Sequence, residues 1–527
     1  MTLKDFFVAG PHDDGSPVTG HYYEIASNDP TRAQVWGYTG ALSYRPGEVL
    51  TLHAMSSAPK ARLVIARDGI APETVLEQDI PTAFHETPAD CSVRGCNWPE
   101  VFRLDIPADW KSGVYTVTLT VPGHRSQHMF VLRAASPTAR IAMVLATGTW
   151  CASNDWGGSN HYQGLTGESG GEFSPHVSLL RPWATGFVAW PEDAPRIPHA
   201  SPLLSRPAYP HMDYARAMGI SKKYASSGWA AFERPFALWC EAQGIGLEYL
   251  TQHDLHRHPD ALAGYDRALI VGHDEYWTWE MRAHLDAWVD AGGQLARFGG
   301  NFFWQTRLSD DLLTQTCFKA TAEQADPLAA TDRITSYWDH PRVGWPAVAT
   351  MGLTGSMGVY AGWSRCAAHG SGGFTIYRPE HWVMEGTGLG YGDVLGAASK
   401  IFGYEVDGID YTMTHGLPFA AEGTGLQGEL TIIGLSPATT LAHSTGPHDV
   451  DHFIGTLDAE DVAQKVYGRV DAETLGRASR GNGCMVEYRR GKGAVFNAGS
   501  CEWVAGLIAR ERPVEQVTRN ILTGPWA

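Results

Sequence analysis

Three ionisable side chains, His273, Asp274 and Glu275, follow an apolar run at residues 267–272. A histidine and a glutamate two residues apart can converge on one small volume, where they serve as general base and metal ligand. Acidic residues also favour the first turn of a helix, so a solvated helix start is the structural alternative. We favour a catalytic site over a helix start, because the segment follows a predicted strand. We therefore predict that Glu275 and His273 are catalytic and bind a metal.

A second polar turn, Gly299-Gly300-Asn301, follows the next predicted strand at residues 294–298. Glycines let the backbone approach a ligand closely, and an asparagine side chain offers both a donor and an acceptor. A turn with asparagine in the left-handed conformation explains the same residues equally well. If the two turns lie side by side they form one cleft, in which Asn301 is the third predicted catalytic residue.

Polar groups lie between aromatic residues in a third segment, at residues 150–159. Cys151 or Ser153 could act as a nucleophile only with a base and an oxyanion hole. Neither residue is surrounded by a G-x-S-x-G motif, so the sequence disfavours nucleophilic catalysis. The residues that we predict to bind substrate are Ser153, Asn154, Trp156, Trp183 and Trp277.

The elements that must position these residues differ between the two parts of the chain. In residues 35–135, apolar and polar residues alternate at 48–54, 61–66 and 114–121, which is the period of a half-buried sheet. No helical segment separates these predicted strands. The pattern favours an antiparallel β-sandwich of the immunoglobulin-like type over residues 1–136.

Strands alternate with helices after this point. Residues 267–272 and 294–298 are predicted strands. Between them, one helical face carries Met281, Leu285, Trp288 and Val289. A β-α-β crossover of this kind places ligand-binding loops at the carboxyl ends of its strands. The sequence therefore predicts an α/β domain over residues 137–527, with an irregular excursion near 321–360.

Composition limits the classes of partner. The chain has 527 residues, of which 43% are hydrophobic, and this is enough for more than one core. Its net charge of −17 would repel a phosphate backbone or an anionic membrane, so neither nucleic acid nor membrane is expected as a partner. We found neither a secretory signal nor an apolar run of about 18 residues, so we expect a cytoplasmic protein with reduced thiols.

Five ordered motifs resemble the large (beta) subunit of N,N-dimethylformamidase, at residues 150–158, 178–183, 272–277, 299–301 and 495–499. The resemblance implies that the α/β domain is glutamine-amidotransferase-like and that the protein is a hydrolase cleaving the C–N bond of a small amide. It also implies a mononuclear iron site held by two tyrosines and one glutamate. Glu275 matches the glutamate ligand, and His273 and Asn301 match the histidine and asparagine of the family's pocket.

The tyrosine ligands of the family have no clear match in this chain. The first lies in a W-x-A-Y-N stretch, where this chain has Ser153, and the second is placed near Trp183. A hydroxyl is a weak ligand beside a phenolate, and an indole supplies no anionic oxygen. The alternatives are a different metal such as zinc on Glu275 and His273, a substitute tyrosine, or no metal. Candidates for further ligands are Cys151, His161, His176, Tyr162 and Tyr276.

Other functions compete with a metal-assisted amidohydrolase. A metal-free C–N hydrolase would use His273 and Glu275 as base and orienting group. A non-catalytic protein that binds carbohydrate or another protein would fit the 19 tryptophans. A glycosidase is disfavoured, because adjacent Asp274 and Glu275 point apart too readily to face each other across a cleft.

The resemblance to the N,N-dimethylformamidase large subunit further implies a homo-oligomer and a small partner subunit.

Overall fold

A computed structural model describes residues 7–9, 22–165, 173–196, 210–358, 372–437 and 456–526. The chain forms two compact units. The first contains the described residues up to Arg196, with Pro210–Ala261 and Thr306–Phe318, and the second contains those of Leu262–Gln305 and Lys319–Ala527. The domain boundary after residue 136 stays a prediction.

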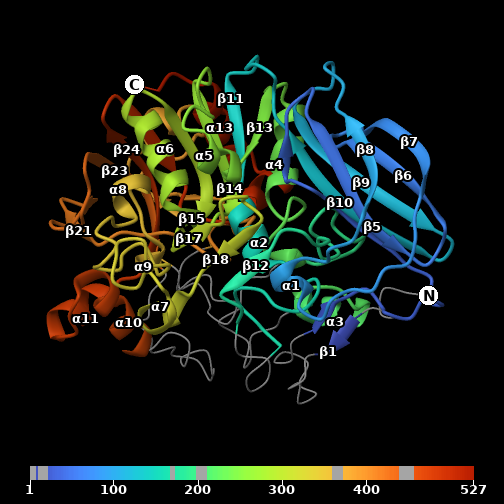
Figure 1. The fold of residues 1–527 in the computed structure, drawn as a ribbon. Helices are drawn as coiled ribbons and strands as arrows, with labels where there is room; N and C mark the ends of the chain where they lie inside the picture. The colour runs from blue at the N-terminus through green and yellow to red at the C-terminus, as the bar shows by residue number, and fades with distance from the viewer. Residues whose placement is uncertain are drawn as a thin grey trace. The chain divides into compact units, whose positions relative to one another are not determined.

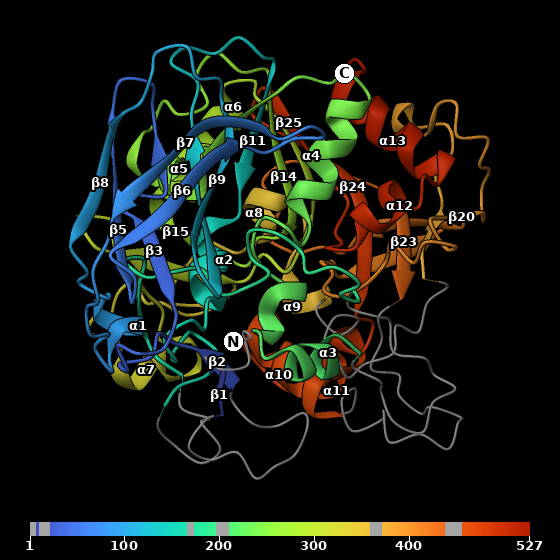
Figure 2. The same ribbon diagram turned by 90° about the vertical axis from the view of Figure 1, so that its right-hand side faces the viewer.

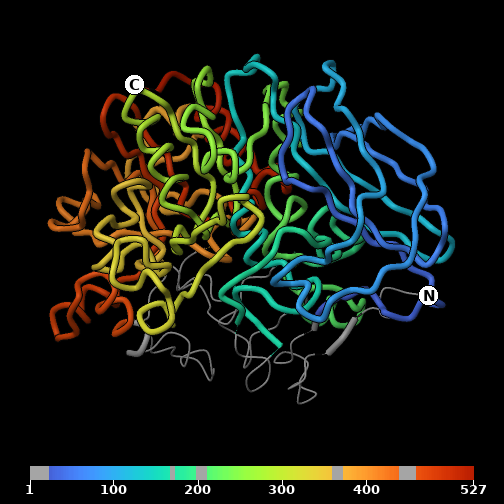
Figure 3. Tube along the Cα trace, in the orientation of Figure 1, coloured from blue at the N-terminus to red at the C-terminus, as the bar shows by residue number. Residues whose placement is uncertain are grey.

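Two β-sheets near the N-terminus of the chain share one hydrophobic core in the first unit (Figures 1 and 3). One sheet has three antiparallel strands, β3 (Val35–Thr39), β5 (Val49–Ser56) and β8 (Glu100–Asp105). The other has the order β4 (Ser43–Tyr44), β10 (His124–Leu132), β9 (Gly113–Val121), β6 (Lys60–Arg67) and β7 (Glu73–Pro81). The predicted antiparallel strands are confirmed, although the two-residue β4 pairs with β10 in parallel.

Alternating residues build this core, as the sequence pattern predicts. Leu50, Leu52 and Ala54 of β5 are almost fully buried, and so are Leu63 and Ile65 of β6. The residues between them along each strand are more exposed. Burial on one face of each strand is what holds the two sheets together.

The rest of the first unit mixes short helices and strands. The strand β11 (Ile141–Leu145), buried at every residue, pairs in parallel with β13 (Leu247–Thr251). The other strands are β1 (Phe7–Ala9), β2 (Tyr22–Glu24), β12 (His176–Ser178) and β18 (Thr314–Thr316). The helices are α1 (Cys91–Arg94), α2 (Thr147–Ser153), α3 (Pro210–Met218), η3 (Lys222–Ala225), α4 (Glu233–Ala242) and α5 (Gln252–Arg257). The described cysteines are buried and none forms a disulfide.

Parallel strands form the centre of the second unit. The strands β14 (Arg267–His273) and β16 (Gln294–Gly300) pair in parallel, and β16 pairs in parallel with β25 (Gly493–Asn497). Antiparallel strands continue the sheet in the order β24 (Asn482–Arg490), β23 (Glu429–Pro437), β19 (Phe374–Ile376) and β20 (Val394–Leu395). The protein is therefore a mixed α/β protein, with a large mixed sheet and an N-terminal antiparallel sheet.

Helices cover both faces of the parallel strands. The predicted crossover helix is confirmed as α6 (Trp279–Asp290), which begins where the Thr278 hydroxyl accepts a hydrogen bond from the Met281 amide. Figure 2 shows α6 on one side of β14 and β25, and α12 (Trp503–Ile508) and α13 (Arg512–Thr523) on the other. This arrangement leaves the carboxyl ends of β14 and β16 available for a site.

Short elements complete the second unit. These are β15 (Tyr276–Thr278), η4 (Lys319–Thr321), α7 (Ala322–Ala325), α8 (Val348–Met351), α9 (Gly355–Gly358), η6 (Trp382–Met384), β21 (Tyr411–Thr414), β22 (Leu417–Ala420), α10 (Thr456–Tyr467) and α11 (Ala472–Ala478). The strand β17 (Trp304–Leu308) begins in this unit. The predicted irregular excursion contains the short helices α7, α8 and α9, and its last two residues lie outside the described ranges. No helix in those ranges is both long and apolar enough to cross a bilayer.

Candidate active site

The register of two parallel strands brings the two predicted polar turns together. His273, the last residue of β14, lies opposite Gly300, the last residue of β16. Glu275 follows the first strand by two residues, and Asn301 follows the second directly. The expectation that these turns share one edge of the sheet is confirmed, although His273 and Gly300 still belong to the strands.

A third segment reaches the same edge because Gly300 has no side chain. A Cβ atom at this position would lie 2.4 Å from the carbonyl oxygen of Glu405. The Glu405 carbonyl also accepts a hydrogen bond from the Cys501 amide at 3.0 Å. The glycine therefore permits a close approach, as predicted, but the group that approaches is another part of the chain.

An imidazole and two carboxylates meet at this edge. The Nε2 atom of His273 lies 2.7 Å from Oε2 of Glu405 and 3.2 Å from Oε2 of Glu275. One ligand atom from each of the three residues lies within 4.8 Å of the others. The side chains of His273 and Glu275 are 4% and 6% exposed, whereas that of Glu405 is 15% exposed. We call these three residues the His–Glu–Glu cluster.

Aromatic residues hold the cluster in place. The indole Nε1 of Trp304 donates to Oε1 of Glu275 at 2.7 Å, and the Trp304 amide donates to the Glu275 carbonyl at 2.8 Å. The ring of Tyr404 stands edge to face against His273, with 5.4 Å between ring centroids. The two oxygens of Glu275 thus face different partners, Trp304 and His273, which fixes the plane of its carboxylate.

The charges of the cluster favour a protonated histidine. Burial by itself lowers the pKa of His273, but the charges and hydrogen bonds of Glu405 and Glu275 outweigh it, and the pKa lies well above its ordinary value. At neutral pH the imidazole therefore carries a positive charge between two carboxylates. A bound cation would take the place of that proton.

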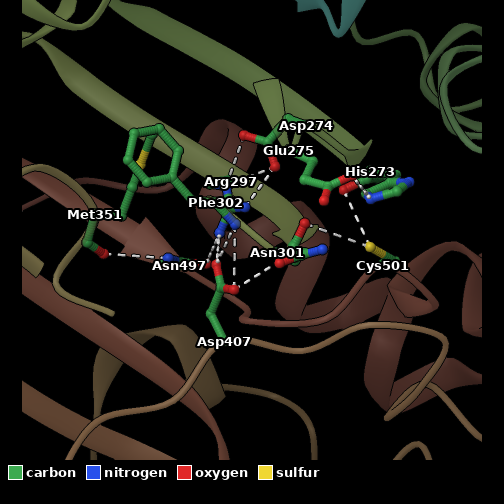
Figure 4. A network of polar contacts seen from close by, with 12 residues as sticks. His273, Asp274, Glu275, Arg297, Asn301, Phe302, Met351, Asp407, Asn497 and Cys501 are labelled. Carbon is green, nitrogen blue, oxygen red and sulfur yellow. Dashed lines mark hydrogen bonds and ion pairs between the residues drawn. The ribbon is translucent and has the colours of Figure 1, made fainter. Parts of the chain in front are cut away.

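Beneath the cluster lies a buried ion network that joins four parts of the second unit (Figure 4). The guanidinium of Arg297 donates to Asp274 through Nε at 2.9 Å, to Asp407 at 2.6 Å and to Asn497 at 3.2 Å. The side chains of the arginine and both aspartates are 0% exposed. Burial lowers the pKa of Arg297, but the two aspartates raise it to a net value above its ordinary one.

Asn301 is positioned from both sides. Its amide donates to Oδ1 of Asp407 at 2.6 Å, which holds the residue in the left-handed conformation with φ at 62°. Its side-chain Nδ2 donates to Oε2 of Glu405 at 2.5 Å. Its Oδ1 atom is buried and accepts no hydrogen bond from the residues that the structure describes. Asn301 therefore combines the turn conformation of the structural explanation with a direct contact to the cluster.

Gly355 of α9 gives a way to displace Asn301 without changing a residue of the His–Glu–Glu cluster, although a Cβ atom there would also lie 3.1 Å from the Phe303 ring. A Cβ atom at this position would lie 2.8 Å from the Asn301 Oδ1 atom, and the glycine has no left-handed φ that would strain alanine. If this edge of the sheet is an active site, we expect Gly355→Ala to lower kcat/KM by about 10- to 100-fold, because displacement of a positioning group by about 1 Å can cost that much. Steady-state kinetics on whichever compound the unchanged chain turns over measures the effect.

The matched control is Gly476→Ala. Gly476 is also a helical glycine, in α11, and a Cβ atom there would meet no heavy atom within 4 Å. Its kinetics should equal those of the unchanged protein. Full activity in Gly355→Ala, with the alanine confirmed in a crystal structure, would show that the position of Asn301 does not matter.

Four of the five predicted substrate-binding residues lie in the first unit. Asn154 donates to the Pro182 carbonyl at 2.9 Å and accepts from the Ala184 amide at 3.1 Å. Ser153 is buried. Trp156 packs edge-on against Trp36 and Trp98, and Trp183 lies between the rings of His128 and Phe187. These contacts show packing roles for Asn154 and the two tryptophans, and binding of substrate by the four stays a prediction.

Trp277, the fifth predicted substrate-binding residue, lies in the second unit, two residues after Glu275. Its indole donates to the Asp274 carbonyl at 2.6 Å, and its ring packs against Phe302 at 5.5 Å. The side chain is fully buried. Trp277 therefore supports the backbone between His273 and Glu275, and direct contact with substrate stays a prediction.

The other candidate ligands have contacts outside the cluster. Burial raises the pKa of Cys151 to about 12, so this thiol stays protonated. His161 contacts the Ser174 carbonyl at 2.8 Å, and His176 contacts the Thr316 hydroxyl at 3.0 Å. Lys223 lies over the ring of Tyr162, and Lys319 over that of Tyr276. Among the described residues, the His–Glu–Glu cluster is the group of three with metal-binding geometry.

Sequence reasoning missed Glu405 and Arg297. The segment Gly403-Tyr404-Glu405-Val406-Asp407-Gly408 has two acidic residues two apart between glycines, which resembles the signal at 273–275. Arg297 interrupts an otherwise apolar strand. Arg297 was the clearer signal of a site, because a charged group in a buried strand needs a partner.

Comparison with known proteins gives one family match, and the matched region contains the candidate site. A family model described as N,N-dimethylformamidase beta subunit-like, C-terminal, matches residues 59–516. A search of curated proteins gives no match. The matched region includes all three residues of the His–Glu–Glu cluster, together with Asn301 and Trp304.

Proposed function

Because the chain belongs to the N,N-dimethylformamidase beta subunit-like family, we propose that it hydrolyses the C–N bond of a small non-peptide amide. The observation that carries this proposal is the His–Glu–Glu cluster, with the side-chain amide of Asn301 touching it. Amide hydrolysis needs an activated water, a group that holds the carbonyl oxygen and a proton for the leaving amine. The cluster offers residue types for each task.

We further propose that His273, Glu275 and Glu405 hold a metal ion. One imidazole nitrogen and two carboxylate oxygens form a donor set that suits iron or zinc. Glu405 supplies an anionic oxygen, which the Ser153 hydroxyl at the family's tyrosine position does not. When bound, such an ion polarises a carbonyl and lowers the pKa of water towards about 7.

The remaining tasks fall to the residues themselves. Asn301 donates from Nδ2 to the carbonyl oxygen of the substrate, where a single such donor is typically worth about 10²- to 10³-fold in rate. Glu405, the most exposed of the cluster, accepts the proton of the attacking water and passes it to the departing amine. Trp304 keeps Glu275 in one orientation throughout, because it donates to the oxygen that His273 does not contact.

A metal-free hydrolase is the second candidate, and the close contacts of His273 with the carboxylates of Glu405 and Glu275 support it. In this version the protonated imidazole gives its proton to the leaving amine, while Glu405 takes one from water. The proposal otherwise keeps the expectations that came with the resemblance. These are a glutamine-amidotransferase-like domain, an immunoglobulin-like domain, a homo-oligomer and a small partner subunit.

Product release from a panel of small amides tests the proposal. The purified chain is incubated with formamide, N,N-dimethylformamide, acetamide and benzamide, and free amine or ammonia is measured beside the metal content of the same sample. We expect amine release with about one metal ion per chain, loss of turnover in a chelator and recovery on adding iron or zinc.

Each alternative predicts a different result in the same experiment. Turnover that continues after complete metal removal identifies the metal-free hydrolase. Retention on a glycan column without turnover of any amide, with metal supplied, identifies a binding protein and overturns the proposal.

A further inference from the structure

Tyr404 has a strained backbone directly beside the His–Glu–Glu cluster. Its φ is 52°, in the left-handed region, which a bulky aromatic residue adopts only at an energetic cost. Residues held in such conformations persist because the surrounding structure fixes them, and they concentrate at functional sites. A strained tyrosine that precedes Glu405 in the chain is therefore a candidate for a functional role.

Two neighbouring residues, Ser500 and Cys501, hold the backbone on either side of Tyr404. The Gly403 amide donates to the Ser500 hydroxyl at 3.1 Å, and the Cys501 amide donates to the Glu405 carbonyl at 3.0 Å. Ser500 and Cys501 are fully buried. Because both anchors belong to one short stretch of chain, they fix the directions in which the backbone enters and leaves Tyr404.

Cys501 also connects this stretch to the ends of the two parallel strands. Its Sγ atom lies 3.5 Å from the carbonyl oxygen of Gly272 in β14 and 3.5 Å from that of Gly300 in β16 (Figure 4). His273 follows Gly272 directly in the chain. The anchors that hold the strained residue are thus themselves fixed relative to His273.

The left-handed conformation lets two consecutive side chains reach the same imidazole. The ring of Tyr404 packs on that of His273 with 5.4 Å between centroids and 85° between planes, and Glu405 Oε2 lies 2.7 Å from His273 Nε2. Consecutive side chains of an extended strand point to opposite faces. A regular strand at 404–405 would therefore direct only one of the two side chains towards His273.

The ring of Tyr404 also limits the orientation of the imidazole. The last torsion of a histidine side chain has broad minima, so the backbone alone does not decide where Nε2 points. In His273 this atom must stay near Glu275 and Glu405, at 3.2 Å and 2.7 Å from their Oε2 atoms. An aromatic ring packed perpendicular to the imidazole restricts its rotation away from these carboxylates.

We propose that Tyr404 is a positioning residue, which orients the imidazole of His273 towards Glu275 and Glu405. It acts through its ring and through its left-handed backbone, and it needs no contact with substrate. The consequence of this placement for turnover rests on the proposed function, whereas the placement itself does not.

Crystal structures and steady-state kinetics of two variants test the proposal. Tyr404→Phe keeps the ring, whereas Tyr404→Gly removes it and adopts the left-handed φ without strain. Tyr404→Phe should keep both carboxylate contacts of His273, with kcat within about twofold of the unchanged chain. In Tyr404→Gly the imidazole should leave its place, and kcat should fall by about 10- to 100-fold with KM changed far less, because a misplaced group costs this much.

The thermal midpoint separates positioning from a structural role. Relief of strain offsets part of the lost ring packing in Tyr404→Gly, so we expect its midpoint to stay within a few degrees of that of the unchanged chain. A merely structural tyrosine would lower the midpoint and leave the kcat of the folded protein unchanged.

The matched control is His415→Gly. His415 is exposed in the turn between β21 and β22, and its φ of 51° nearly equals that of Tyr404. The substitution relieves the same kind of strain at a position outside the cluster. It should therefore leave both kcat and the contacts of His273 unchanged.

The outcomes distinguish this proposal from the proposed function. A Tyr404→Gly structure in which His273 keeps both carboxylate contacts overturns the positioning role, and so does loss of these contacts in Tyr404→Phe. If the unchanged chain turns over no amide, with metal supplied or removed, the hydrolase function fails. The two crystal structures still decide whether Tyr404 orients His273.

Discussion

Glu405→Gln should remove most of the metal from the purified chain and lower kcat/KM for amide cleavage by about 10³-fold or more. Glutamine has nearly the same shape but no anionic oxygen to offer a cation. Glu405 also contacts both His273 and Asn301, so its loss disturbs at once the proposed metal ligand His273 and the side chain of Asn301, which we propose holds the substrate carbonyl. Elemental analysis and steady-state kinetics on one preparation measure both effects.

The control for this prediction is Glu429→Gln. Glu429 begins β23 and is exposed, so the substitution removes the same charge without touching the cluster. It should keep full metal content and turnover, and circular dichroism should show both variants folded. A Glu405→Gln protein with unchanged metal and unchanged turnover would exclude Glu405 from the site. Loss of metal with full turnover would contradict both proposed mechanisms, because the metal-free version also needs Glu405 as its base.

The sequence predicted those parts of the fold that depend on local periodicity. The alternation at 114–121 corresponds to β9, and the apolar positions Met281, Leu285 and Val289 are the buried face of α6. Because parallel strands in register end at the same edge, predicting β14 and β16 also placed His273 near Asn301. This part of the site follows from short-range patterns alone.

Glu405 could not be found in the same way. It lies 130 residues after Glu275 and belongs to no strand or helix, so no periodicity points to it. Its position depends on the space left by Gly300 and on a hydrogen bond from Cys501, and both are contacts between distant parts of the chain. Contacts of this kind are set by tertiary packing, which one sequence does not reveal.

Arg297 is an intermediate case. An arginine in the middle of Leu295-Ala296-Arg297-Phe298 needs a buried counter-charge, which the sequence alone would suggest. Asp274 lies next to His273 and was visible as a candidate acid, yet its partner proves to be this arginine. The two acidic residues of the turn therefore have different roles: Glu275 belongs to the His–Glu–Glu cluster, and Asp274 belongs to the ion network of Arg297.

Arg297→Met should lower the free energy of unfolding by about 3–5 kcal/mol, because it leaves two buried carboxylates without their cation. Burial raises the pKa of Asp274 to about 6, so near neutral pH this carboxylate is ionised when the arginine is present. Asp407 also holds the amide of Asn301, so the variant should lose activity with stability. Urea unfolding followed by tryptophan fluorescence measures the loss of stability.

Two further variants show whether burial of the network is the cause. Arg62 of β6 also lies between two carboxylates, Glu77 and Asp79, but all three side chains are about half exposed. Arg62→Met should therefore cost no more than about 1 kcal/mol. Combining Arg297→Met with Asp274→Asn should recover part of the lost stability, since one uncompensated charge is gone. Equal losses in the two arginine variants would contradict the view that buried charges hold the active-site segments together.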